Sequence, residues 1–369
     1  MKSFEWVAFS DVHLYHPNTP THHILERLDE MIFLNDKLMS TIKMILVPGD
    51  FWDRDIGLET PECKLIKNWL TARLELCHRL GIHYIQMEGT PSHDYKQGYV
   101  IPLLCQSPYI HYIDTLCIKR FDDLDMDIMF IPDEWKPKCE DIRLDVLECL
   151  HKHNMTQVDV VSMHGMFGHQ LPKGIKLDHH DAHFYSSIAR HVVVCGHVHT
   201  PSKWKNVYVP GSTDRLRHNE EEEKGYWYFT STPKKTKGVF QVNENAWIYK
   251  TFDVRNMTYE DGIRLVTNGA INMSDGSFIQ IRAEKNSPLL NIRDLKQQFP
   301  NLNWKTDRKD LQSTELAVET VNLTPNQQPL NALTKDNLIP RLEEFAVDTN
   351  RLWTPDMARL TETLLSRLK

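Results

Sequence analysis

Residues 192–199 read Val-Val-Val-Cys-Gly-His-Val-His. An apolar run of this kind is typical of a strand buried on both faces, and we expect a strand at His191–Cys195. The glycine that follows allows a sharp turn, because it has no Cβ. Two histidines one residue apart, His197 and His199, can then address two neighbouring metal ions. The stretch therefore predicts a buried strand whose carboxyl end carries metal ligands.

Other apolar runs lead into residues of the same chemistry. Polar side chains follow four further predicted strands: Asp11 and His13 after Trp6–Phe9, Asp50 after Met44–Val47, Ser92, His93 and Asp94 after Ile82–Met87, and His164 after Val158–Met163. A strand is also expected at Ile128–Ile131, and helical spacing predicts helices between Ile24 and Leu38 and over Glu62–Leu80. Strands that alternate with helices indicate a layered α/β fold, in which such side chains gather at one edge of a sheet.

The length and charge of the chain restrict what it can do. It has 369 residues, of which 41% are hydrophobic and 25% are charged. This length predicts two or three domains, and the composition is that of an ordinary globular protein. The formal net charge is -7. Because polyanion binders are more often basic, any attraction to nucleic acid would be local and would come from metal ions or a partner chain.

The seven cysteines form no C-x-x-C pair, and their number is odd. A disulfide framework or a structural zinc site is therefore not expected, and a reducing, cytoplasmic setting is. The first residues lack the apolar stretch of a signal peptide. No apolar run reaches the roughly 18 residues that a membrane span needs, so we expect no membrane association.

The composition changes near residue 235, after which a basic, turn-like stretch begins. We expect a first domain at residues 1–235 and a small α+β domain at residues 236–318. Within the second, a strand is predicted at Ser277–Arg282, a helix at Asn291–Phe299 and a strand near Trp304. Residues 319–333 have the composition of a linker, and residues 334–369 predict a tail of short helices.

Taken together, the motifs D-x-H, G-D, H-D, H and G-H-x-H resemble those of the calcineurin-like metallophosphoesterase superfamily. The resemblance implies a layered β-sandwich flanked by helices, with a small capping domain and a C-terminal helical tail. It also implies two divalent metal ions, Mn2+ in the first place and Mg2+ as the alternative. The residues that it implies are Asp11, His13, Asp50 and His199 for one ion, Asp50, His164 and His197 for the other, and His93 as proton donor or charge stabiliser, oriented by Asp94.

One position departs from the family pattern. The family has an asparagine ligand immediately before the catalytic histidine, and Ser92 stands there in this chain, in a longer loop. Ser92, a backbone carbonyl or an extra water would complete the second metal site. The chain has 19 histidines, and several are expected to be structural or surface residues: His22, His23, His151, His153, His179, His180 and His183.

The flanks of the last motif point to one branch of the superfamily. Residues 210–215 and 221–226, and the stretch from Gly49 to Asp53, resemble SbcD-type nuclease subunits, which partner an SMC-like ATPase. The resemblance implies a metal-dependent DNA exonuclease or endonuclease in recombination, repair or replication. The size resembles tailed-phage versions, which would act in the cytoplasm of a bacterial host.

The same resemblance implies several partners. Residues 334–369 would dock on the ATPase, residues 236–318 would contact DNA, and the chain would form a homodimer. A modest phosphate-contact patch is predicted at Lys234, Lys235 and Lys237, with a solvated loop as the alternative. Two other functions remain open: a phosphatase or phosphodiesterase acting on small phosphoesters, and a non-catalytic scaffold.

Overall fold

The computed structural model describes residues 2–133, 136, 138–171 and 174–308, all within the first of two units of the chain, Met1–Thr314. The end of the predicted capping domain (309–318), the predicted linker (319–333) and the predicted helical tail (334–369) lie outside these residues. No helix in the described part of the chain is both long and apolar enough to cross a membrane.

The first sheet has six strands in the order β12-β11-β1-β2-β3-β4. Four parallel strands form one side of it: β1 (Phe4–Ala8), β2 (Ile42–Pro48), β3 (His83–Met87) and β4 (Ile110–Ile113). The hairpin of β11 (Gly225–Ser231) and β12 (Thr236–Val242) continues the sheet antiparallel to β1. This hairpin corrects the predicted boundary at residue 235, because β12 pairs along its whole length with β11 and so belongs to the first domain.

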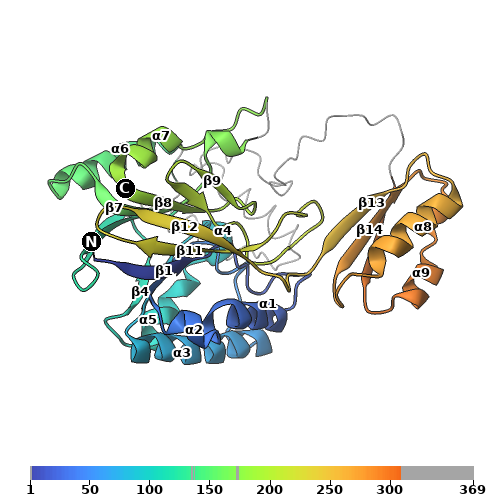
Figure 1. The fold of residues 1–369 in the computed structure, drawn as a ribbon, viewed down its shortest axis with the longest axis horizontal. Coiled ribbons are helices and arrows are strands. Elements are labelled where there is room, and N and C mark those ends of the chain that lie inside the picture. The colour runs from blue at the N-terminus through green and yellow to red at the C-terminus, as the bar shows by residue number, and fades with distance from the viewer. Residues whose placement is uncertain (1, 134–135, 137, 172–173, 309–369) are drawn as a thin grey trace, which may run out of the picture. The chain divides into compact units, whose positions relative to one another are not determined.

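Helices cover the outer face of this sheet (Figure 1). They are α1 (Thr21–Leu28), a π-helical turn (Asp29–Phe33), α2 (Asp36–Met39), α3 (Pro61–Leu80) and α5 (Val100–Leu104). The helix predicted over Glu62–Leu80 is present as α3. It begins where the Thr60 side chain caps the backbone N–H of Cys63, and it ends at Gly81 with φ 64°, a left-handed conformation suited to glycine.

The second sheet also has six strands, in the order β5-β6-β7-β8-β10-β9. The strands are β5 (Cys117–Phe121), β6 (Met126–Ile131), β7 (Val158–His164), β8 (Ala189–Gly196), β9 (Ser202–Trp204) and β10 (Val207–Val209). Strands β6, β7, β8 and β10 run parallel. Helices α6 (Cys139–Lys152) and α7 (Ala182–Ile188) pack on its outer face.

The two sheets pack face to face, because side chains alternate along each strand. In β1, Trp6 and Ala8 join the core between the sheets, whereas Val7 joins the core under the helices. Val192 and Val194 of β8, in the second sheet, belong to the same core as Trp6 and Ala8. The predicted layered α/β fold, with two sheets flanked by helices, is confirmed.

A third sheet follows in the chain. It consists of three parallel strands, β13 (Tyr249–Asp253), β14 (Phe278–Ala283) and β15 (Asn303–Arg308). Helices α8 (Tyr259–Ala270) and α9 (Arg293–Gln298), with a short turn at Pro288–Leu290, connect them and cover its apolar residues. The predicted elements near 277, 291 and 303 are present, and β13 and α8 were missed. The three-stranded sheet therefore starts at Tyr249, and it belongs to the same compact unit, Met1–Thr314.

Candidate metal centre

Four candidate ligands lie on a strained backbone at the carboxyl ends of strands. Asp11, His13, Asp50 and His197 have φ angles of 52°, 51°, 51° and 95°. This left-handed region is costly for residues with a Cβ, and such strain concentrates at functional sites. Gly49 also has a positive φ, of 93°, and a Cβ there would lie 2.4 Å from Nδ1 of His164. The turn after β2 therefore needs a glycine so that β7 can bring its terminal histidine close.

The first group of converging side chains is Asp11, His13 and His199, whose ligand atoms all lie within 4.8 Å of one another. Nε2 of His13 lies 3.0 Å from Nε2 of His199, and Nε2 of His199 lies 3.9 Å from Oδ1 of Asp11. All three come from predicted ligand positions, although almost the whole first domain separates His13 from His199 in the sequence.

The second group is Asp50, His164 and His197, again with ligand atoms within 4.8 Å of one another. Nε2 of His164 lies 3.2 Å from Oδ1 of Asp50. The other carboxylate oxygen of Asp50, Oδ2, lies 3.9 Å from Nε2 of His13 in the first group. Asp50 therefore stands between the two groups, as a bridging ligand would.

Thr90 joins the second group, and sequence reasoning missed it. Its Oγ1 lies 3.3 Å from Oδ2 of Asp50, 3.2 Å from Nε2 of His164 and 3.5 Å from Nδ1 of His197. Ser92, the predicted stand-in for the family's asparagine, is exposed on the short helix α4 (Pro91–Asp94), and none of the described contacts joins it to the group. The hydroxyl beside the ligands is that of Thr90, because α4 turns residue 92 outward.

Hydrogen bonds from outside the groups orient the rings of two of the histidines. Nδ1 of His164 lies 2.8 Å from the carbonyl oxygen of Pro48, which only accepts, so Nδ1 carries the proton and Nε2 faces Asp50. Nδ1 of His199 is 2.8 Å from a carboxylate oxygen of Glu220 in the same way. The partners of His164 and His199 fix the tautomer that a metal ligand needs. The backbone N–H of His197 donates to both carboxylate oxygens of Asp11 and so joins the two groups.

Glu220 was not predicted as a site residue. It is the first of four consecutive glutamates, and it alone among them is buried, which no local pattern reveals. Its carboxylate also lies 3.2 Å from Nζ of the buried Lys224. Burial alone would raise the pKa of Glu220, but the hydrogen bond to His199 and the charge of Lys224 hold it well below its usual range.

The buried pair of Asp50 and His164 favours the charged form of both side chains. Burial alone would raise the pKa of Asp50 and lower that of His164, but their attraction outweighs it in both. The pKa of Asp50 is held well below its usual range, and that of His164 rises to about 10. Burial lowers the pKa of His197 to about 4, so its imidazole is neutral at neutral pH. A neutral imidazole and a carboxylate are donors that suit divalent transition metals.

His93 and Asp94 do not form the predicted pair. Nδ1 of His93 lies 2.9 Å from the carbonyl oxygen of Asp53, and its ring packs edge-on against His13 at 4.9 Å between centroids. The buried Asp94 instead accepts backbone N–H bonds from Trp52 at 2.9 Å, Gly89 at 2.6 Å and Asp50 at 3.1 Å. The expectation that Asp94 orients His93 is wrong. The carboxylate oxygens of Asp94 accept three backbone N–H bonds, and Nδ1 of His93 bonds to Asp53 instead.

Asp53 connects the centre to His93. Its Oδ1 lies 3.4 Å from Nδ1 of His13, and Asp53, His13 and His93 form a third group of potential donors. One signal in the sequence pointed to Asp53. It is the last residue of the stretch from Gly49 to Asp53, which resembles the nuclease subunits.

The predicted phosphate-contact lysines lie away from this centre. Lys234 and Lys235 form the turn of the β11–β12 hairpin, and Lys237 is exposed on β12. The strand register pairs Ser231 with Phe4 and Trp227 with Ala8, so this turn lies at the amino end of β1. Asp11 follows the carboxyl end of β1. The alternative expectation of a solvated turn fits this placement better.

No protein-family model and no curated protein matches the chain. Among solved structures, the crystal structure of TT1561 of Thermus thermophilus is similar at 12% identity and a TM-score of 0.40, over 65% of this chain and 99% of that one. A second crystal structure is similar at 13% identity and a TM-score of 0.38, over 64% of this chain and 99% of that one. Likeness at this level carries no inference about family or function.

Proposed function

We propose that this chain is a two-metal phosphodiesterase of the calcineurin-like metallophosphoesterase superfamily. The observation that carries the proposal is the position of Asp50. Its two carboxylate oxygens lie toward different histidines, His164 at 3.2 Å and His13 at 3.9 Å, each in a separate group of three donors. A carboxylate shared between two such groups can bridge a pair of neighbouring divalent ions.

The residues fit such a pair of ions by their chemistry. Asp11, His13, Asp50 and His199 would hold one, and Asp50, His164, His197 and the Thr90 hydroxyl would hold the other. Mn2+ suits this mixture of imidazole and carboxylate donors, with Mg2+ as the alternative. Bound there, divalent ions supply Lewis acidity toward a phosphoryl oxygen and lower the pKa of water.

The chain's own groups supply the remaining chemistry. Since the carbonyl oxygen of Asp53 only accepts, Nδ1 of His93 donates to it, which leaves Nε2 to exchange a proton with a phosphoester oxygen. Asp94 holds the backbone between Asp50 and Trp52 in place through its three N–H bonds. Glu220 keeps Nε2 of His199 turned toward His13.

For the substrate we propose DNA, with the chain as an SbcD-type nuclease subunit in recombination, repair or replication. Support comes from residues 210–215 and 221–226, whose sequence resembles those subunits. Glu220, which lies between these two stretches, contacts His199. The net charge of -7 is compatible with a polyanion, because two divalent ions would add about four positive charges at the site. An SMC-like ATPase and a second copy of this chain are the proposed partners, in a bacterial cytoplasm.

The test is degradation of linear duplex DNA by the purified full chain, with and without Mn2+. We expect cleavage only with the metal, and its loss in His93→Ala, while metal binding and melting temperature stay at wild-type values. His151→Ala, which removes an exposed histidine of α6, is the matched control. Faster turnover of small phosphate monoesters than of DNA would favour a phosphatase. An absence of any metal-dependent turnover, also with the ATPase added, would leave only a scaffold.

A further inference from the structure

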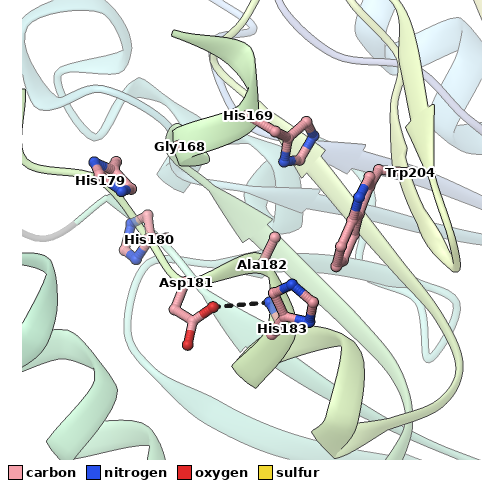
Figure 2. A pocket seen from close by; sticks show the side chains of 8 residues that line it. All are labelled: Gly168, His169, His179, His180, Asp181, Ala182, His183 and Trp204. Atoms are coloured by element: carbon pink, nitrogen blue, oxygen red, sulfur yellow. Dashed lines mark hydrogen bonds between the residues drawn. The ribbon is translucent and has the colours of Figure 1, made fainter. Parts of the chain in front are cut away.

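A second cluster of histidines surrounds a pocket beside the candidate metal centre. Figure 2 shows His169, His183 and Trp204 on one side of this pocket, and His179 and His180 on the other. The cavity has a volume of about 300 Å³, at the lower end of the range for small-molecule sites. From the sequence alone, His179, His180 and His183 are expected to be structural or surface residues.

The pocket is lined by flat rings and is not a metal cage. The Trp204 ring is nearly parallel to that of His169, at 5.5 Å and 22°, and it meets His183 edge-on at 4.7 Å. Among the described residues, the groups of three donors close enough to hold a metal all belong to the centre described above. What the pocket offers is therefore aromatic surface with imidazole donors and acceptors at its edges.

Two of the lining rings lie on segments that follow candidate ligands. His169 follows His164 at the end of β7, on the turn Gly168–Gln170, and Trp204 ends β9, the strand that follows His199. His180 is buried against the intervening backbone, since a Cβ on Gly165 would lie 2.6 Å from its Nε2. A five-residue segment spans at most about 18 Å, so the pocket is within reach of a strand whose phosphate lies at the metal centre.

One exposed lysine stands next to the tryptophan. Nζ of Lys205 lies 4.5 Å from the centroid of the Trp204 ring. Lys203 faces the other side of β9, where its Nζ lies 4.9 Å from the centroid of Tyr208. Asp181 is the acidic residue of the lining, and it accepts the backbone N–H of His183 at the start of α7. Aromatic rings beside cations are the combination that binds single-stranded nucleic acid without base-pair readout.

We propose that this pocket binds a nucleobase, supplied either by a DNA strand that reaches the metal centre or by a free nucleotide. The proposal rests on the proposed phosphodiesterase function for its substrate class. The base would occupy the cavity that His169, His183 and Trp204 line on one side, and its phosphate would face Lys205, which lies beside Trp204.

The experiment measures binding of a labelled single-stranded oligodeoxynucleotide to the full chain with Mn2+. Phosphorothioate linkages make the probe resistant to hydrolysis. We expect Trp204→Ala to raise the Kd roughly five- to a hundredfold, the range for removal of an aromatic partner from a base. Trp204→Phe, which keeps a ring, should restore most of the affinity, and His151→Ala should bind as wild type. His169→Ala tests the same side of the pocket if the tryptophan variant fails to fold.

The outcomes separate this proposal from the previous one. An unchanged Kd in Trp204→Ala and His169→Ala, equal binding of an abasic strand, or no binding by the wild type would overturn the pocket. Competition by a deoxymononucleotide would show that the pocket binds free nucleotides. A lack of competition would show that it binds a base within a DNA strand. Hydrolysis of bis-para-nitrophenyl phosphate by the same wild-type preparation tests the metal centre alone, because that diester has no nucleobase.

Discussion

The hydroxyl of Thr90 lies 3.2 Å from Nε2 of His164 and 3.3 Å from Oδ2 of Asp50. The backbone N–H of Thr90 also donates to Oδ1 of Asp50, at 2.6 Å. One residue at the end of β3 therefore both orients the bridging carboxylate and places an oxygen among the ligands of the second group. That oxygen takes the position that we expected the Ser92 hydroxyl to take.

Thr90→Val removes this oxygen and keeps the shape of the side chain. We expect the amount of Mn2+ bound per chain to fall from about two ions toward one in calorimetric titration, since the second group loses one of its four donors. The melting temperature in the presence of a chelator should change little. Ser92→Ala, two residues away and exposed, is the matched control and should bind metal as wild type. A larger loss in the Ser92 variant would restore Ser92 as the ligand.

Glu220→Gln tests the partner of His199. An amide in place of the carboxylate weakens the hold on Nδ1, and loss of such a partner typically costs about 10- to 100-fold in metal affinity. It also leaves Lys224 buried without its counter-charge, which costs about 3–5 kcal/mol in the free energy of unfolding. Denaturant unfolding and metal titration measure the two effects. Glu223→Gln, on the exposed end of the same run, should show neither of them.

Asp94→Asn tests whether Asp94 acts through the backbone. The amide group would turn N–H atoms toward N–H donors of Asp50, Trp52 and Gly89, and a buried donor left unpaired costs about 1–3 kcal/mol. We expect this loss of unfolding free energy in metal-free protein, where a purely catalytic role would have no effect. Asp55→Asn, an exposed neighbour, is the control. Stability equal to wild type in the Asp94 variant would remove the structural role.

The pH dependence of stability is expected to include a contribution from His111. Burial, and then the neighbouring His83, lower the pKa of His111 from 6.5 to about 4. Between these values the unfolded chain binds the proton and the folded chain does not, so stability rises with pH. The stability that His111 contributes is lost as the pH falls from about 6.5 toward about 4.

His111→Gln removes this titration and keeps a hydrogen-bonding group for Nδ1 of His83, 3.2 Å away. We expect its melting temperature to fall less than that of the wild type over the same pH range. His151→Gln should follow the wild-type curve. Identical slopes for His111→Gln and wild type would show that the imidazole of His111 titrates normally in the folded protein.

Much of the first domain could be predicted from the sequence because its signals are local. Apolar runs such as Met44–Val47 form strands buried on both faces, and each predicted ligand comes directly after such a run. Parallel strands place their carboxyl ends at one edge. The convergence of Asp11, Asp50 and His164 therefore follows from order along the chain, and so does the layered α/β class.

Other features depend on contacts between distant segments, which only the tertiary structure decided. The choice of Thr90 over Ser92 depends on how α4 turns away from Asp50, and the burial of Glu220 depends on His199 and Lys224. The end of the first domain depends on the pairing of β12 with β11. Local sequence determines which residues can bind a metal ion. The packing of the two sheets determines which of their atoms face one another in the candidate site.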